Sequence, residues 1–225
     1  MRWSEIALLV VAVLLVLGWL AWVFASRLDR LHRKVVASRM ALDAQLVRRA
    51  VAAADLAAAG VLDPASSVLV IAASVEVSAG DEHGDYELVA ALPDLASAVG
   101  SRAAARPSRS AVSRALDDGL GPARTQAESN LSATLREVLG DETEVARLYG
   151  AEASADLLGG LAGAWYRVQL ARRFHNESVD QARSLRQGAF VRALHLAGRA
   201  TMPQTVDLDD AWPPLLHRPA GATAI

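Results

Sequence analysis

A run of twenty uncharged residues, from Ile6 to Ala25, constrains this chain more than any other feature of its sequence. The run reads IALLVVAVLLVLGWLAWVFA. As a helix rising about 1.5 Å per residue, it would cover about 30 Å, the thickness of the hydrocarbon core of a bilayer. Trp19 and Trp22 lie near one end, where indole rings favour the headgroup level. We predict a transmembrane helix over residues 6–25, in contact with the lipid bilayer.

A cleaved signal peptide is the alternative interpretation, because VFA before Ser26 resembles a cleavage site. The apolar run exceeds the about 7–15 residues of a typical signal-peptide core, and only Arg2 precedes it as a basic residue. We therefore favour an anchor, with residues 1–5 as a short extracytoplasmic N-terminus.

Basic residues are concentrated directly after the apolar run, at Arg27, Arg30, Arg33 and Lys34. Such clusters stay on the cytoplasmic side of a membrane. We predict a single-pass protein of the cell (inner) membrane, with its N-terminus outside and its C-terminal domain in the cytoplasm. The same four residues are candidates for contact with anionic lipid headgroups. Alternatively, they determine topology and nothing more.

The composition favours helices and excludes several functional classes. Hydrophobic residues make up 52% of the chain but aromatic residues only 5%, so alanine, leucine and valine must fill the interior, as in helical proteins. The net charge of −2 provides no field that would recruit nucleic acid. Because there is no cysteine, disulfides, thiolate metal sites and a cysteine nucleophile are excluded.

Helical periodicity continues behind the apolar run as far as Gly60, a natural helix stop. Asp63 and Pro64 have the cap and first-turn chemistry of a new helix. Residues 66–78 are rich in β-branched side chains and permit a strand, although we favour a helix. Residues 78–85, SAGDEHGD, are predicted to form a loop.

Two later helices complete the predicted body. One begins at Pro122 and ends near Leu139. The other is long and has a heptad seam, formed by Leu157, Leu161, Ala164, Val168, Ala171, His175, Ser178, Ala182 and Leu185. His175 and Ser178 are the polar members of this seam. The chain is therefore predicted to be an all-α protein. We expect an N-terminal transmembrane helix and an antiparallel, four-helix-like bundle over residues 26–200. The proline-rich residues 201–225 are predicted to be an extended, disordered tail.

No catalytic motif is present. The five histidines lack metal-ligand spacing, and neither H-E-x-x-H nor G-x-S-x-G occurs. We therefore predict no cofactor, no metal site and no enzymatic activity.

Three segments carry motifs in a fixed order. The first, RLDRLHRKVVASRMALDAQLVRRA, ends in a Q-L-x-R-R pattern formed by Gln45, Leu46, Arg48 and Arg49. The second, AESNLSATLREVL, contains Ala127, Glu128, Leu131, Ser132 and Leu135. The third, ARRFHNESV, contains Ala171, Arg172, Arg173, Phe174, Asn176 and Val179. Together these segments resemble the LemA family of membrane-anchored helical proteins.

The resemblance implies an N-terminal membrane helix and an antiparallel bundle of long helices, and it implies no established catalytic activity. The chain is similar to a divergent member, because His175 stands where the family has tyrosine. After Arg49 the sequence AVAAADLAA also replaces the family's leucine-isoleucine-proline-asparagine.

Paired arginines on a helix point about 100° apart, so one of each pair can lie in the seam. We predict that Arg48 and Arg172 are partly buried and that one of them pairs with Glu128 from a facing helix. Arg49 and Arg173 are predicted to be exposed. His175 is predicted to pack in the seam.

Two hypotheses of function follow. The first is a membrane-anchored helical scaffold that binds an unknown protein partner through an exposed apolar or arginine-rich patch or through its tail. The alternative is a hydrolase or small-ligand-binding protein that uses a polar cleft near Arg172, His175 and Asn176.

Overall fold

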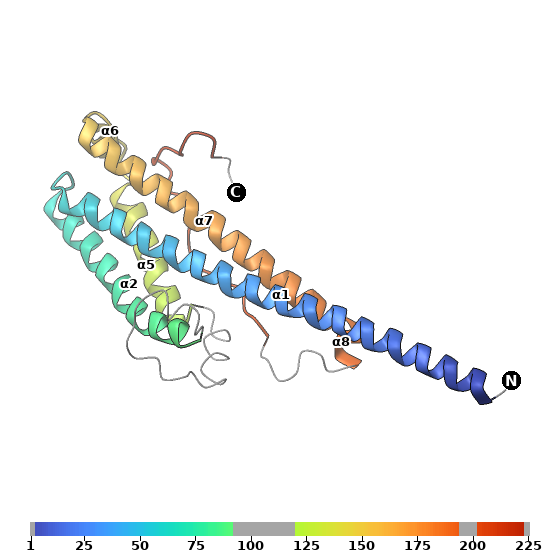
Figure 1. Ribbon diagram of the computed structural model, residues 1–225. Helices are drawn as coiled ribbons and strands as arrows, with labels where there is room; N and C mark the ends of the chain where they lie inside the picture. The colour runs from blue at the N-terminus through green and yellow to red at the C-terminus, as the bar shows by residue number, and fades with distance from the viewer. Residues whose placement is uncertain (1–2, 92–119, 194–201, 223–225) are drawn as a thin grey trace.

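The computed structural model describes residues 3–91, 120–193 and 202–222 (Figure 1), and all regular secondary structure in these residues is helical. The helices are α1 (Trp3–Ala58), α2 (Pro64–Ala91), α5 (Pro122–Val138), α6 (Glu142–Tyr149), α7 (Glu152–Gln187) and α8 (Ala189–Ala193). The predicted all-α class is therefore confirmed.

The four long helices α1, α2, α5 and α7 alternate in direction and form an antiparallel bundle (Figure 1). The longest contact is between α1 and α7. Near one end of it, Lys34 Nζ donates a 3.0 Å hydrogen bond to Gln181 Oε1. Farther along, the Arg49 guanidinium lies 5.0 Å from the centroid of the Trp165 ring. The predicted antiparallel long-helix bundle is confirmed.

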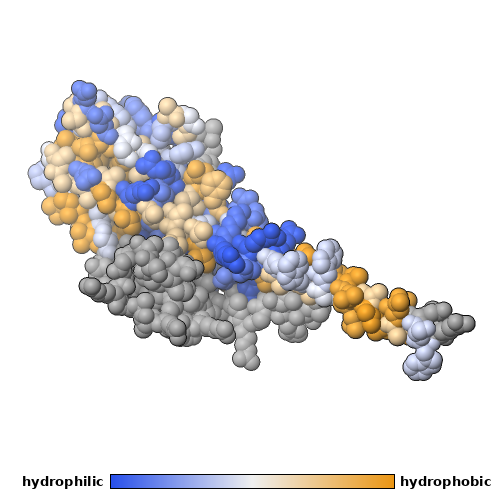
Figure 2. Space-filling model, in the orientation of Figure 1, coloured by the Kyte–Doolittle hydropathy of each residue, from blue (hydrophilic) through white to orange (hydrophobic). Residues whose placement is uncertain are grey.

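The first third of α1 projects beyond the bundle as an apolar rod (Figures 1 and 2). Every described side chain from Ile6 to Trp19 is exposed. Within the described residues, α1 alone is long and apolar enough to cross a membrane. The helix continues without a break into the bundle, where Leu31 and Val35 pack against α7.

Local sequence signals set the helix ends. Gly60, just past the end of α1, has a φ of 68°, a conformation that glycine adopts without steric cost. Asp63 Oδ1 caps α2 by accepting hydrogen bonds from the backbone N–H groups of Ala65 (3.0 Å) and Ser66 (3.1 Å). Residues 66–78 are therefore part of a helix, as we favoured.

The predicted loop at residues 78–85 is wrong, because α2 continues to Ala91. The prediction rested on Gly80, Gly84 and nearby acidic residues. Each such residue lowers helix propensity by about 1 kcal/mol or less, which is too little to end a helix that is already formed.

The core follows the predicted seam of α7. Six seam positions are buried: Leu161, Ala164, Val168, His175, Ser178 and Ala182. The main apolar cluster joins α1, α2, α5, α6 and α7 around Trp165, and smaller clusters continue along the α1–α7 contact.

Residues 202–222 contain no helix or strand but pack along the bundle (Figure 1), so the prediction of a disordered tail is wrong. Prolines prevent a helix here, but they do not prevent packing of an extended chain. Val206, Leu208 and Asp210 alternate with exposed residues and are buried, which is the period of an extended chain lying on a surface. Leu216 joins the main core.

Candidate functional site

Arg49 and Glu128 form a buried ion pair between α1 and α5. Arg49 Nη2 lies 2.8 Å from Glu128 Oε2, and Arg49 Nη1 donates a 2.9 Å hydrogen bond to Ser132 Oγ. All three residues are fully buried. Because Arg49 also makes a cation–π contact with Trp165 of α7, one side chain fixes the positions of three helices.

Two further arginines extend this pair into a buried network. Arg124 lies between the two carboxylates, with Nε 3.9 Å from Glu128 Oε1 and Nη2 3.7 Å from Asp43 Oδ1. Arg39 Nε lies 3.9 Å from Asp43 Oδ2. The charges thus alternate from Arg39 to Arg49. In such an arrangement each buried charge is compensated, and the network specifies helix register more than it adds stability.

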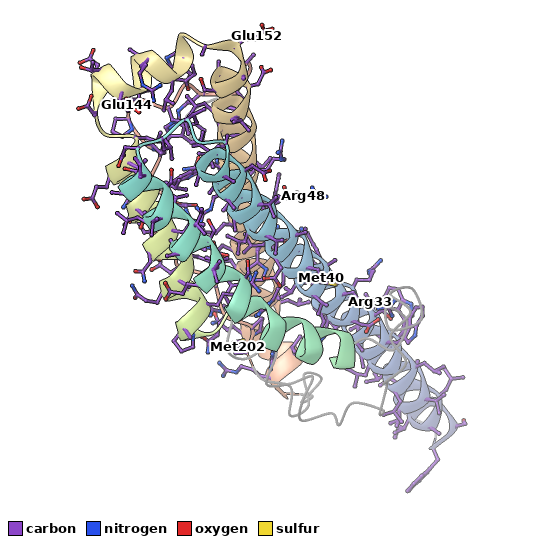
Figure 3. All side chains as sticks on the ribbon, turned by 90° about the vertical axis from the view of Figure 1, so that its left-hand side faces the viewer. Arg33, Met40, Arg48, Glu144, Glu152 and Met202 are labelled. Carbon is purple, nitrogen blue, oxygen red and sulfur yellow. The ribbon has the colours of Figure 1, made fainter. Side chains whose placement is uncertain are left out.

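The predicted roles of the first arginine pair are reversed. We predicted that Arg48 would be partly buried and Arg49 exposed, whereas Arg49 is buried and Arg48 points away from the bundle (Figure 3). Helical phase explains the difference: Leu42, Leu46 and Arg49 follow each other at steps of four and three on one face, and Arg48 lies about 100° away. Continuing the helical spacing of Leu42 and Leu46 by three residues would have identified Arg49, from the sequence alone, as the buried arginine of the pair.

A stripe on one face of α7 binds the C-terminal segment, which we define as residues 202–222. The stripe consists of Trp165, Gln169, Arg172, Asn176 and Arg183, which recur at helical spacing. Each of these five side chains donates a hydrogen bond to the segment. Part of the arginine-rich motif therefore binds another part of the same chain.

Asp210 is the central contact of the segment. Arg172 binds its carboxylate through two hydrogen bonds, Nε to Oδ2 at 2.7 Å and Nη2 to Oδ1 at 2.9 Å. Trp165 Nε1 and Gln169 Nε2 both donate to the Asp210 backbone carbonyl, at 2.9 and 2.8 Å. Arg172 is half-buried and paired, but a pairing with Glu128 is wrong, because the face of α7 that carries Arg172 lies against the C-terminal segment.

Asn176 binds the backbone of Val206 in both directions. Its Nδ2 donates to the Val206 carbonyl at 3.0 Å, and its Oδ1 accepts from the Val206 N–H at 2.9 Å. Arg183 Nε donates to the Pro203 carbonyl at 2.8 Å. The side-chain amide thus replaces the backbone partner that a neighbouring β-strand would supply.

The stripe on α7 and the part of the C-terminal segment that it binds have similar lengths. From Arg183 to Trp165, α7 rises about 27 Å at about 1.5 Å per residue. From Pro203 to Asp210, an extended chain covers about 24 Å at about 3.4 Å per residue. The segment therefore runs antiparallel to α7 in an almost fully extended form.

The segment also contacts α5. Arg136 Nη1 donates a 2.9 Å hydrogen bond to Asp209 Oδ1, and this interaction holds the pKa of Asp209 below its usual range. The Asp209 N–H donates to Ser129 Oγ at 3.1 Å. Because Asp209 faces α5 and Asp210 faces α7, the two neighbouring carboxylates fix the segment between these helices.

Beyond Asp210 the segment crosses the end of the bundle near α6. The Trp212 ring lies 6.3 Å from the Trp165 ring, in a tilted arrangement. His217 stacks on Tyr149 with ring centroids 4.0 Å apart, and its backbone N–H donates to Tyr149 Oη at 2.9 Å. This end of the segment is therefore anchored independently of Asp210.

The remaining motif residues are divided between the core and the surface. Leu131 is buried, whereas Gln45 and Ala171 are half-buried. Arg173 is exposed, as predicted, and Phe174 is 56% exposed. Phe174 is the large apolar side chain of the motif that the bundle does not use for packing.

His175 is buried in the α1–α7 contact. Ser38 Oγ donates to the Val35 carbonyl at 2.8 Å and lies 3.1 Å from His175 Nδ1. Because the serine proton is already used, the hydrogen-bond pattern assigns the histidine proton to Nδ1. Burial, followed by the positive charge of Arg39, lowers the pKa of His175. The imidazole is therefore neutral at pH 7. Ser178, the other polar seam residue, donates to the Phe174 carbonyl at 2.7 Å.

The hydrolase alternative requires Arg172, His175 and Asn176 to converge. Arg172 and Asn176 bind the C-terminal segment, whereas His175 faces Ser38 on α1. In the part of the chain that the structure describes, the three side chains therefore form no common cleft.

Together, the fold and this site define an all-helical protein with a long apolar N-terminal helix that could span a membrane and an extended segment bound to its bundle. No protein-family model, curated protein or solved structure matches the chain.

Proposed function

We propose that the protein is a membrane-anchored helical scaffold of the LemA type, which binds a protein partner through an apolar surface of its bundle. The anchor is supported by the exposure of Ile6–Trp19, since apolar side chains on all sides of a helix need a nonaqueous environment. The LemA assignment is supported by the specific contacts of Arg49, Glu128, Arg172 and Asn176, which give four motif residues structural roles.

Orientation is proposed from the basic residues that follow the apolar run, at Arg27, Arg30, Arg33 and Lys34. They favour a cytoplasmic bundle and an outside N-terminus, and they are suited to contact anionic lipid headgroups.

The single observation that carries the scaffold proposal is an apolar stripe on the outer face of α2. Val68, Leu69, Ile71 and Val75 are between 40% and 66% exposed, although large apolar side chains normally lie in the core of a small helical domain. Val68, Ala72 and Val75 follow each other at helical spacing, which suits a helix of the partner laid along α2.

On the neighbouring helix, Val47 and Val51 are also exposed. Helices α1 and α2 together thus expose more apolar surface than α2 does alone. Exposed apolar surface of this kind commonly marks protein interaction sites.

A site-specific photo-crosslinker at Val68, in the full chain in its native membranes, tests the partner surface. We expect a crosslinked adduct that is absent when the crosslinker replaces exposed Arg167 of α7. The double variant Val68→Asp/Val75→Asp should lose binding to the partner identified from that adduct. Ala153→Asp/Ser184→Asp, which places the same two charges at exposed positions of α7, should retain it. Equal yields at Val68 and Arg167 would contradict the proposal, and an adduct of twice the chain's mass would identify the partner as a second copy.

The anchor and its orientation have separate tests. The full chain should remain in the membrane fraction after alkaline carbonate extraction, and its intact mass should include residues 1–25. A mature chain beginning at Ser26 would instead identify a signal peptide. A reporter fused after Ile225 should be active only if its activity requires the cytoplasm, and activity of an extracytoplasmic reporter would reverse the orientation.

A further inference from the structure

Two segments that are distant in the sequence meet at the end of the bundle closest to the apolar rod. Leu31 and Val35 of α1 pack against Val179 and Ala182 of α7. Lys34 Nζ is hydrogen-bonded to Gln181 at the same level. The C-terminal end of α7 therefore lies beside the first turns of α1 that follow the apolar run.

The end of α7 is level with the end of the apolar run. Arg186 lies four residues past Ala182, or about 6 Å farther toward the rod, and α8 follows it. Ala25 lies six residues before Leu31, or about 9 Å in the same direction. Helix α8 follows directly after the end of α7 (Figure 1).

The exposure of the apolar run changes at the same level. Every described side chain from Ile6 to Trp19 is exposed, whereas Leu20, Ala21, Val23 and Phe24 are partly covered. A bilayer around residues 6–25 would therefore lie next to the end of α7.

Positive charge is concentrated in these two segments. Residues 26–38 and 181–193 together contain seven arginines and lysines and one acidic residue, Asp29, which pairs with Arg33. The whole chain has a net charge of −2, so the remaining residues are strongly acidic. These two basic segments therefore differ in charge from the rest of the sequence.

The two basic segments also influence each other electrostatically. Partial desolvation, and then the positive charge of Arg186, lower the pKa of His32 on α1. Arg192 of α8 is exposed. Arg186 of α7 therefore lies close to the basic residues of α1, and the exposed Arg192 follows it by six residues.

We propose that these basic residues form a surface that binds the headgroups of anionic phospholipids and that α7 and α8 complete it. The basic collar, as we name it, consists of Arg27, Arg30, Arg33, Lys34, Arg186 and Arg192. Guanidinium groups suit it to this ligand, because they bind phosphate oxygens through paired hydrogen bonds. The collar rests on the proposed membrane anchor and adds a second chain segment, about 150 residues away in the sequence, to the lipid contact.

Native mass spectrometry of the detergent-solubilised full chain, titrated with phosphatidylglycerol and separately with phosphatidylcholine, tests the collar. We expect tighter binding of phosphatidylglycerol. Arg192→Gln should weaken that binding about fivefold and Arg186→Gln/Arg192→Gln about 25-fold, from the usual contribution of a basic residue beside an anionic bilayer. Excess inorganic phosphate should not displace the lipid, whereas displacement would indicate a site for free phosphate and overturn the proposal.

The matched control is Arg48→Gln/Arg173→Gln, which removes two exposed arginines from the bundle surface above the collar. It should leave the affinity for phosphatidylglycerol unchanged. Equal weakening by the control, or no weakening by Arg192→Gln in a chain with unchanged circular dichroism, would overturn the proposal. Carbonate extraction separates this outcome from failure of the anchor, because a chain without the collar interaction would still remain in the membrane.

Discussion

Arg49 of α1 and Glu128 of α5 are joined by a 2.8 Å ion pair, and neither side chain is exposed to solvent. Substitution of one partner would leave the other as an uncompensated buried charge. We expect Arg49→Ala or Glu128→Ala to lower the free energy of unfolding by about 3–5 kcal/mol. Denaturant unfolding of the full chain in detergent, followed by circular dichroism, measures the change.

Two controls belong to this prediction. Arg48→Ala removes the adjacent, exposed arginine and should change stability by less than about 0.5 kcal/mol. The double variant Arg49→Met/Glu128→Leu should be less destabilised than the sum of its single changes, because it removes both charges together. Additive single effects would show that the two residues do not interact.

The contact between Arg172 and Asp210 should control the docking of the C-terminal segment. Asp210→Asn keeps the size of the side chain but removes the charge, which should weaken docking by about 1–3 kcal/mol. We expect faster backbone hydrogen exchange over residues 203–210, measured by mass spectrometry. Asp207→Asn removes the charge of an exposed residue in the same segment and should leave exchange unchanged. Equal exchange in the two variants would contradict a role for Asp210 in docking.

Burial of neutral His175 should make stability depend on pH. The pKa of His175 is lowered in the folded chain, so between this value and the unfolded pKa of about 6.5 the unfolded chain binds more protons. Stability should therefore fall as the pH decreases below about 6.5. His175→Asn keeps an N–H donor for Ser38 without a titrating ring, and it should reduce this slope. Unfolding measured at several pH values in both chains tests the prediction, and identical slopes would contradict it.

Two glycines should respond in opposite ways to substitution by alanine. Gly160 lies inside α7, and an added Cβ would meet no atom within 4 Å. Gly160→Ala should therefore stabilise the chain by about 0.5–1 kcal/mol. Gly60 has a φ of 68°, so Gly60→Ala should destabilise it by about 1 kcal/mol. Thermal unfolding compares the two, and shifts of the same sign would show that backbone conformation does not decide the effect.

Most of the fold could be predicted from the sequence, because its signals are local or periodic. Asp63 and Pro64 mark the start of α2 through cap chemistry, and the heptad spacing from Leu161 to Ala182 identifies the buried face of α7. The continuation of α2 through Gly80 and Gly84 could not be predicted in this way, since it depends on the rest of the helix and not on those residues.

The site was less predictable, because its partners come from distant segments. The sequence identified Arg172 and Asn176 as unusual residues in a helix, but nothing local indicates that they bind Asp210 and Val206. The alternation of Val206, Leu208 and Asp210 was the available signal for an extended packed chain. The prolines around this alternation, however, favour disorder.

The unbroken course of α1 also determines how far the apolar stripe of α2 lies from the membrane. From Ala25 to its end at Ala58, the helix rises about 50 Å, and α2 runs back from Pro64, which places Val68 about 6 Å and Val75 about 17 Å below its start. With residues 6–25 in a bilayer and the helix upright, the apolar stripe stands about 33–44 Å above the hydrocarbon core. A partner that binds the stripe from the membrane side must therefore extend over this distance, as a folded domain of about 100 residues or more on the headgroups would.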